Sequence, residues 1–336
     1  MRLFESLELA VLLVYVLGFF ISKRFRPVLW GALPFLALVL VMLTTLIEGY
    51  RIQMLVGHVL TAIFCLFTLY QQYRKTKPEK AWRWWRWIPR IITPVVALSL
   101  CALAIALPYM FYVFHVPTPS GSYQIGTTDF SVTDPNRLEK WTTDPYDHRE
   151  LMVKMWYPAD LSEDSKLVPY DPYASEGSKV IARLLKQTIR LPETWFNYMG
   201  LVKSNSYLEP PVATAQQKYP IIIFSHGYLV GSMTQNTILM EELASNGYIV
   251  VSIGHTFETL FVSPPDGRVL PFNRKRAEQF WGEVNKTNDV RRILTLGHDE
   301  ETLGSMFKDA IKTVPTLDSS INTWDEDVHF INDVVE

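Results

Sequence analysis

A short run near the middle of the chain has residue types that suit acyl-transfer chemistry. Residues 220–228 read Pro-Ile-Ile-Ile-Phe-Ser-His-Gly-Tyr, an apolar stretch that ends in Ser225, His226 and Gly227. In acyl transfer, negative charge develops on the carbonyl oxygen, and each backbone N–H aimed at that oxygen contributes about 3–4 kcal/mol. Gly227 allows a sharp turn, so that the N–H of Tyr228 can point into a site. The same tripeptide also fits an ordinary strand-to-helix turn, and the residues alone leave both interpretations open.

No nucleophile of the usual kind accompanies this run. The 336 residues contain no G-x-S-x-G motif, the strained turn on which many hydrolases present a reactive serine. Ser225 lies in the right neighbourhood, but its side chain leaves the end of a strand, and the sequence assigns no general base to it. Another titratable cluster, residues 298–301, is contiguous and cannot all face one site, so we expect it at the surface.

The run belongs to a predicted strand–helix–strand unit. Residues 220–224 form a continuous apolar run, which is typical of a strand buried on both faces of a parallel sheet. A helix follows and ends at Asn246 and Gly247, a pair that favours a left-handed helix end, and residues 248–253 form the next strand. The buried face of the helix is predicted to consist of Leu239, Met240, Leu243 and Ala244. This βαβ crossover indicates an α/β fold with a mostly parallel sheet.

Other predicted elements flank this unit. Strands are expected at 126–133 and 149–158, and an amphipathic helix at 180–189, whose role as a lid the sequence leaves open. Pro265-Asp266-Gly267 predicts a tight turn. The helical segment after it is expected to expose Arg274, Lys275 and Arg276. A last helix at 321–335 has the apolar members Trp324, Val328, Phe330, Ile331 and Val334.

The first 114 residues have a different character. They carry 12 Lys and Arg against 4 Asp and Glu, whereas the rest of the chain carries 20 against 30. Residues 28–47 and 91–113 are uncharged and long enough to cross a hydrocarbon core of about 30 Å, and residues 4–21 and 54–70 are nearer the lower limit. Glu5 and Glu8 lie at the end of the first run, where they can reach the headgroups. We therefore predict four transmembrane helices.

Positive charge predicts the orientation of these spans. Ten Lys and Arg residues lie in the connections at 23–26 and 74–90, whereas only Arg2 and Arg51 lie near the membrane on the other side. By the positive-inside rule, both termini and the hydrolase-like part are expected outside the cytoplasmic membrane of a multi-pass protein. The basic flank at 23–26 also argues against a cleaved signal peptide. The predicted domains are residues 1–114 in the membrane, a tether at 115–122 that contains Pro and Gly, and a globular part at 123–336.

Three features of the membrane part have simple interpretations. Residues 81–87 interleave tryptophan with arginine, and their place between two spans favours an aromatic belt over a nucleic-acid surface, so no nucleic-acid partner is expected. His58 is the one clear ionisable residue inside a span and has no partner at helical spacing within its own segment, which disfavours a transporter. Cys65 and Cys101 lie in predicted spans, so the globular part has no disulfide.

Three blocks of sequence resemble the platelet-activating-factor acetylhydrolase family of α/β-hydrolases, in its plasma and type II forms and their bacterial relatives. The blocks are residues 149–159 (Arg-Glu-Leu-Met-Val-Lys-Met-Trp-Tyr-Pro-Ala), 219–227 and 242–251, in the family's order and spacing. The resemblance covers about residues 126–255, and residues 324–334 are similar to the helix that precedes the family's nucleophile. It implies the N-terminal part of an α/β-hydrolase domain and a serine esterase.

The resemblance also implies roles at the site. Tyr228 would supply one oxyanion N–H, and Phe224, His226 and Gly227 would shape the turn. The family's triad follows in the order Ser, Asp, His, all beyond the last residue given, so that no triad residue is expected here. His255 is then expected to be structural or to lie at the rim of the site. We therefore expect a fragment of a longer enzyme, in which residues 221–224 form an exposed apolar edge.

Three functions are left open by the sequence. The first is a membrane-anchored serine esterase that cleaves short or oxidised acyl chains from phospholipids, inactive as these 336 residues stand. The second is a non-catalytic membrane protein with a lipid- or partner-binding half-domain, and the third is a membrane protein that functions within the bilayer. The expected partners are membrane lipid and a phospholipid or short-chain ester substrate. No cofactor or metal is implied, because the sequence has neither a Gly-rich phosphate loop nor a metal-ligand pattern.

Overall fold

The chain divides into two compact units. The computed structural model describes residues 1–22, 25–26, 28–75, 88–186, 190–286 and 300–335. The first unit comprises Met1–His115 together with Ile189–Val202, and the second comprises Val116–Thr188 and Lys203–Glu336. A stretch that lies well inside the predicted globular part therefore belongs to the helical unit.

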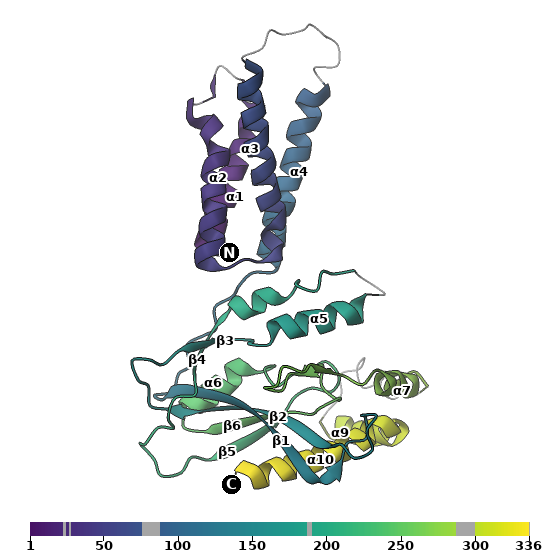
Figure 1. The fold of residues 1–336 in the computed structure, drawn as a ribbon. Helices are drawn as coiled ribbons and strands as arrows, with labels where there is room; N and C mark the ends of the chain where they lie inside the picture. Colours follow the sequence, from purple (N-terminus) through teal and green to yellow (C-terminus); the bar gives the residue numbers. More distant parts are fainter. Residues whose placement is uncertain (23–24, 27, 76–87, 187–189, 287–299, 336) are drawn as a thin grey trace. The chain divides into compact units, whose positions relative to one another are not determined.

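The first unit is a bundle of apolar helices (Figure 1). Its elements are α1 (Leu3–Leu17), η1 (Gly18–Phe20), η3 (Val28–Ala32), α2 (Leu33–Leu43), η4 (Thr44–Glu48), η5 (Ile52–Met54), α3 (Leu55–Lys75), α4 (Ile88–Met110) and η6 (Asn197–Leu201). Leu12, Ala37 and Cys101 are among the side chains buried between the helices. Outward side chains are apolar as well, and Leu46 is 82% exposed. Helices that are apolar all round are typical of a membrane environment.

Three stretches of this unit are long and apolar enough to cross a membrane, namely Leu3–Phe20, Leu29–Glu48 and Ile52–Tyr73. The prediction of four spans was wrong by this criterion. The fourth apolar stretch found among the described residues, Pro94–Met110, is shorter and belongs to α4. The tryptophan-rich segment at 81–87 lies outside the described residues.

The acidic residues of α1 point inward, so the prediction that they reach the headgroups was wrong. The carboxylate of Glu5 receives hydrogen bonds from Nε and Nη2 of Arg51, both at 2.6 Å. Glu8 is also fully buried, and its Oε2 lies 3.4 Å from Nε2 of His58. Buried charges in an apolar bundle need such partners. His58 does have a partner, but on a different helix, where spacing within one segment cannot reveal it.

The second unit is built on a six-stranded sheet among the described residues, in the order β3-β4-β1-β2-β6-β5 (Figure 1). The strands are β1 (Gln124–Leu138), β2 (His148–Ala159), β3 (Leu167–Pro169), β4 (Lys203–Leu208), β5 (Ile221–Ser225) and β6 (Ile249–Gly254). The short strands β7 (Phe261–Val262) and β8 (Leu270–Pro271) pair separately. Only β1–β4 and β5–β6 are parallel, so the prediction of a mostly parallel sheet was wrong. The connection between β1 and β2 is too short for a crossover and makes them antiparallel.

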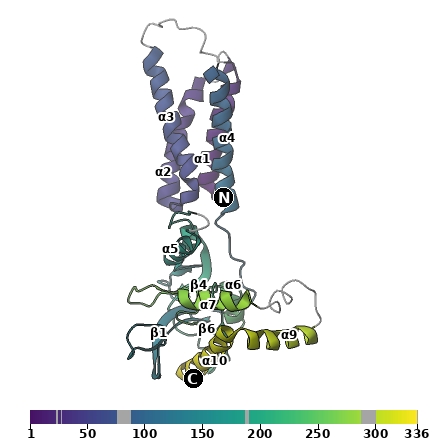
Figure 2. The same cartoon turned by 90° about the vertical axis from the view of Figure 1, so that its right-hand side faces the viewer.

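Helices cover both faces of this sheet (Figure 2). The described helices of this unit are α5 (Ala174–Leu185), α6 (Thr237–Ser245), α7 (Arg274–Val284), α9 (Glu300–Thr313) and α10 (Pro315–Val335), of which α6 and α10 pack on opposite faces. Neighbouring residues of β6 show the two faces: Val250 clusters with Met240 of α6, whereas Val251 clusters with Ile331 of α10. Because side chains alternate along a strand, β6 is sandwiched between the two helices.

The predicted βαβ crossover is confirmed. β5, α6 and β6 follow one another, β5 and β6 are parallel, and Gly247 after the helix has φ +92°. Met240 and Ala244 are buried as predicted, but Leu239 is exposed. β5 ends the sheet, and β6 is its one strand neighbour among the described residues.

Within the titratable cluster at 298–301, Glu301 is exposed as predicted, and residues 298–299 lie outside the described residues.

Candidate functional site

Two parallel strands deliver polar side chains to one edge of the sheet. β5 ends at Ser225, and His255 directly follows the end of β6. The carboxyl ends of neighbouring parallel strands meet at the same edge, where α/β proteins commonly bind ligands. There, Oγ of Ser225 lies 3.0 Å from Nε2 of His255. His255 is fully buried, so it is not a residue of the rim.

α10 supplies the third side of this site. Oδ2 of Asp327 lies 2.8 Å from Nδ1 of His255. The indole of Trp324 stacks on the imidazole of His255, with ring centroids 4.0 Å apart and planes 6° from parallel. Ser320, Trp324, Asp327 and Ile331 follow at helical spacing and share one face. The sequence predicted the apolar residues of this helix. Its polar site residues were not predicted, although they also recur at helical spacing.

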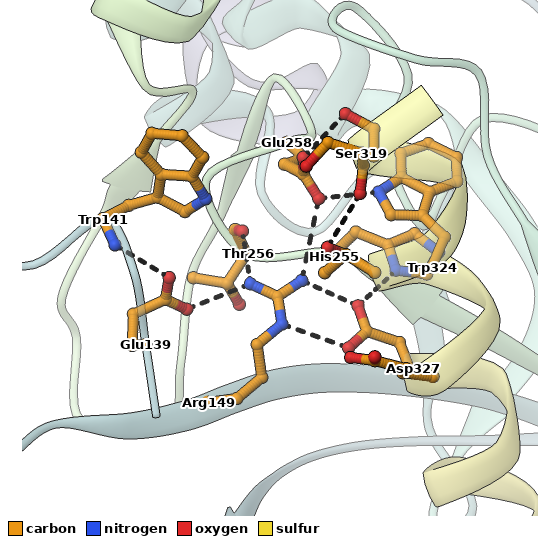
Figure 3. A network of polar contacts seen from close by, with 12 residues as sticks. Glu139, Trp141, Arg149, His255, Thr256, Glu258, Ser319, Trp324 and Asp327 are labelled. Carbon is orange, nitrogen blue, oxygen red and sulfur yellow. Dashed lines mark hydrogen bonds and ion pairs between the residues drawn. The ribbon is translucent and has the colours of Figure 1, made fainter. Parts of the chain in front are cut away.

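Arg149 of β2 binds the same aspartate (Figure 3). Its Nε and Nη2 donate to the two carboxylate oxygens of Asp327 at 3.1 and 2.7 Å. Its Nη1 donates to Oε2 of Glu139 and to the carbonyl oxygen of Thr256, both at 3.0 Å. Bidentate pairs of this kind are strong and directional. Asp327 therefore joins β2, α10 and the residue after β6.

The charges of this network fix the tautomer of His255. Burial opposes ionisation of Asp327, but hydrogen bonds from His255 and Arg149 outweigh it and hold the pKa of the carboxyl well below its usual range. Because Asp327 is ionised, Nδ1 of His255 donates to it and Nε2 accepts from the hydroxyl of Ser225. Burial lowers the pKa of His255, against the effect of Asp327, and the charge of Arg149 lowers it further. His255 is therefore neutral.

A second buried carboxylate, Glu258, connects the remaining parts of the site. It accepts hydrogen bonds from Nε1 of Trp324 at 3.0 Å and from Oγ of Ser320 at 2.8 Å. Nε of Arg276 lies 2.6 Å from Oε1 of Glu258, the oxygen that also accepts from Ser320. Burial raises the pKa of Glu258, while the Arg276 charge opposes that shift. The prediction that Arg276 is solvated was wrong, because Glu258 provides a buried counter-charge for it.

The Ser-His-Gly-Tyr turn is held at both ends. Ser225 bonds to His255, and the hydroxyl of Tyr228 lies 3.0 Å from Oγ of Ser320. The residue of the turn with left-handed backbone is Leu229, with φ +69°, whereas Gly227 has no positive φ and room for a Cβ. Gly231 is the position that requires glycine, since a Cβ there would lie 2.2 Å from the carbonyl oxygen of Gly227. Backbone strain of this kind gathers at functional sites. That Tyr228 supplies an oxyanion N–H stays a prediction.

His226 is a second buried, neutral histidine. It is only 3% exposed, and its ring centroid lies 5.4 Å from that of His255 and 5.2 Å from that of Trp324. Burial, with a smaller contribution from His255, lowers the pKa of His226 to about 3. Its Nδ1 lies 2.9 Å from the carbonyl oxygen of Gly227, and a carbonyl can only accept, so Nδ1 carries the proton. Its Nε2 has no hydrogen-bond partner in the described part of the chain.

A cavity lies beside the network. A cavity of about 340 Å³ is lined by residues that include Trp141, Arg149 and Arg276. Among the described residues, no three His, Cys, Asp or Glu side chains gather so that they could hold a metal ion. The expectation that the chain needs no cofactor stays a prediction.

The parallel crossover and the polar turn at its carboxyl edge give the second unit an α/β fold. Residues 110–263 match the family model described as platelet-activating factor acetylhydrolase, isoform II. Over residues 110–263 the chain is therefore similar to this family of α/β-hydrolases.

Individual proteins are also similar to part of the chain. Platelet-activating factor acetylhydrolase of the guinea pig, Cavia porcellus, is 26% identical over 155 residues, which cover 43% of this chain and 29% of that protein. The enzyme of that name from the dog, Canis lupus familiaris, is 27% identical over 144 residues, covering 42% and 28%. A solved structure of a ferulic acid esterase from Streptomyces cinnamoneus shows 26% identity and a TM-score of 0.38, covering 56% of this chain and 52% of that one. The match thus spans less than a third of either acetylhydrolase.

Replacing Asp327 tests whether the network depends on it. Asp327→Asn should lower the free energy of unfolding of the second unit by about 3–5 kcal/mol, because Arg149 stays buried without its bidentate counter-charge. The measurement is denaturant unfolding of the full chain in detergent, followed by amide hydrogen exchange in β2 and β6. Glu326→Gln is the matched control: this exposed carboxylate pairs with Arg137, and its loss should cost less than about 1 kcal/mol. Equal effects of the two substitutions would contradict the assignment.

The buried histidines should make the second unit sensitive to acid. An unfolded histidine has a pKa near 6.5, whereas that of folded His226 is about 3, so only the unfolded chain takes up a proton between these values. Stability is therefore full above the unfolded pKa and falls with pH, by about 1.4 kcal/mol through His226 between about pH 7.5 and 5.5. His226→Gln should remove this part of the loss, measured as the difference in unfolding free energy between the two pH values. An unchanged pH dependence would show that His226 is charged or exposed in the folded chain.

Proposed function

We propose that this chain is a membrane-anchored protein of the platelet-activating-factor acetylhydrolase type that binds phospholipid esters with short or oxidised acyl chains at an oxyanion site but does not itself cleave them. The family match supports an ester as the ligand. The observation that carries the proposal is the turn at residues 225–228, held at the carboxyl ends of β5 and β6 by bonds at both Ser225 and Tyr228. A turn fixed in this way presents backbone N–H groups without reorganisation, which is what stabilisation of an oxyanion requires.

One observation favours a second role, in which Ser225 itself attacks the ester. Ser225, His255 and Asp327 are hydrogen-bonded in the order of a serine-hydrolase triad. Three features argue against that role: His255 is fully buried under Trp324, its pKa is lowered by burial, and Asp327 already neutralises Arg149. An imidazolium beside Arg149 would meet a positive charge, so His255 is a poor general base. We propose that these residues hold the turn, and that the 336 residues alone do not turn over an ester.

The membrane anchor is part of the same proposal. Three helices are long and apolar enough to span a bilayer. The Lys and Arg residues in the connections at 23–26 and 74–90 indicate that these connections face the cytoplasm. We propose that α4 (Ile88–Met110) crosses with the three helices as a fourth span, so that both termini and the second unit lie outside the cytoplasmic membrane. A protein that binds phospholipid esters gains from this anchor, because its ligand is concentrated in the bilayer.

The proposal predicts that the chain binds an ester-like anion without being acylated. The full chain in lipid nanodiscs, labelled with ¹⁵N-tyrosine, is titrated with a phosphonate analogue of an acetylated ether phospholipid. The amide signal of Tyr228 should shift with saturation, while that of the exposed Tyr146, on the β1–β2 connection, should not. A fluorophosphonate probe should label no serine.

Each arm has its own contradicting result. Labelling that Ser225→Ala abolishes would show that Ser225 is a nucleophile and that the 336 residues are active. Labelling that persists in Ser225→Ala would locate a nucleophile elsewhere in them. Absence of a Tyr228 shift would contradict the ester-binding role and favour a non-catalytic half-domain that binds lipid or a partner elsewhere.

A further inference from the structure

A segment that follows α5 in the sequence is built into the helical unit. Residues 190–202 belong to the first unit, although the chain on either side of them belongs to the second. Nε2 of Gln53, in η5 just before α3, donates to the carbonyl oxygen of Trp195 at 2.6 Å. The ring of Phe111, just beyond the end of α4, meets the ring of Trp195 edge-on, with centroids 5.2 Å apart. The segment is therefore fixed at one level of the bundle, where α3 begins and α4 ends.

The backbone of this segment satisfies its own hydrogen bonds. The N–H groups of Trp195, Asn197, Met199 and Val202 each donate to the carbonyl oxygen three residues earlier, at 3.0–3.2 Å. These consecutive turns include the short helix η6. Internal pairing matters next to lipid, since a backbone group that finds no water must be bonded within the protein.

The side chains of the segment are those of a membrane interface. Residues 195–201 read Trp-Phe-Asn-Tyr-Met-Gly-Leu, carry no charge and are all half-buried. The end of α4 continues this surface, because Tyr109 and Met110 are 73% and 70% exposed. Tyr198 meets Phe111 as well, with ring centroids 6.3 Å apart, so the two stretches are contiguous. We call residues 109–112 and 195–201 the aromatic collar.

The aromatic collar is better suited to the lipid interface than to water. Large rings with one polar end, such as Trp and Tyr, are favoured at the headgroup level, where ring and polar group both find suitable surroundings. Two charged residues at the same end of the bundle are turned inward: Arg51 pairs with the buried Glu5 and donates to the carbonyl oxygen of Phe111. Arg51 and Glu5 therefore neutralise each other and present no free charge to headgroups that approach the collar.

We propose that the aromatic collar lies in the headgroup region of the bilayer, so that residues 195–201 form a membrane contact separate from the spanning helices. The partner is the boundary between phospholipid headgroups and acyl chains. The inference rests on the proposed membrane anchoring and is independent of the ester chemistry. It gives the chain a second attachment to the lipid surface, directly continuous in sequence with α5 and β4.

Spin labels on the full chain in phosphatidylcholine and phosphatidylglycerol nanodiscs test the proposal. Cys65 and Cys101 are replaced by alanine, and nitroxides are attached to Phe196→Cys and Met199→Cys in separate proteins. Power saturation then compares collisions with oxygen, which enters lipid, and with a polar nickel chelate, which stays in water. Accessibility to nickel at the collar should be lower than at Tyr146→Cys by on the order of tenfold, with oxygen accessibility retained, as expected for the interface.

Two reference sites separate the possible failures. Tyr146 is 82% exposed on the second unit and reports water, whereas Leu66 is 67% exposed on α3 and should report hydrocarbon. If Leu66→Cys is open to nickel, the membrane anchoring is wrong and the collar inference falls with it. If Leu66→Cys reports lipid while the collar positions match Tyr146→Cys, or are shielded from both reagents by protein, only the collar inference is overturned.

Discussion

The buried ion pair between Arg149 and Asp327 is the interaction on which the rest of the site depends. It joins a strand to a helix that lies 178 residues further along the chain. Asp327 compensates the buried guanidinium and, with the same carboxylate, sets the tautomer of His255. Through His255 it reaches Ser225, the first residue of the turn. A single carboxylate thus links the core of the second unit to its carboxyl edge.

Burying this much charge is costly, and apolar residues of similar shape commonly give equal or better stability. The network lies at the edge where β5 and β6 end, while the rest of α10 is anchored by apolar packing of Ile331 against the sheet. Stability alone therefore does not require Arg149 or Glu258. Their hydrogen bonds are directional, and together they fix both ends of the turn at residues 225–228, next to the left-handed Leu229, which apolar contacts would leave free to shift.

The periodicity of apolar residues was enough to predict those elements of the fold that depend only on residues close together in the sequence. The apolar run at β5, the helix end at Gly247 and the following strand were predicted from residue type and spacing, and the structure confirms them. Strand direction and charge partners depend on segments far apart in sequence, which explains the wrong prediction of a mostly parallel sheet. It also explains why Arg276 was taken as solvated and His58 as unpaired, since Glu258 and Glu8 lie on other elements. The helical spacing of the polar residues of α10 can be read from the sequence, but the residues that they bind cannot.

The tautomer of His255 tests the central claim most directly. The account requires a neutral ring at neutral pH, with the proton on Nδ1 directed at Asp327 and an unprotonated Nε2 that accepts from Ser225. ¹⁵N NMR of histidine-labelled full chain in nanodiscs, assigned with His255→Asn, distinguishes the two ring nitrogens. The predicted spectrum has a protonated Nδ1 and a hydrogen-bonded, unprotonated Nε2. A proton on Nε2, or a doubly protonated ring, would contradict the account.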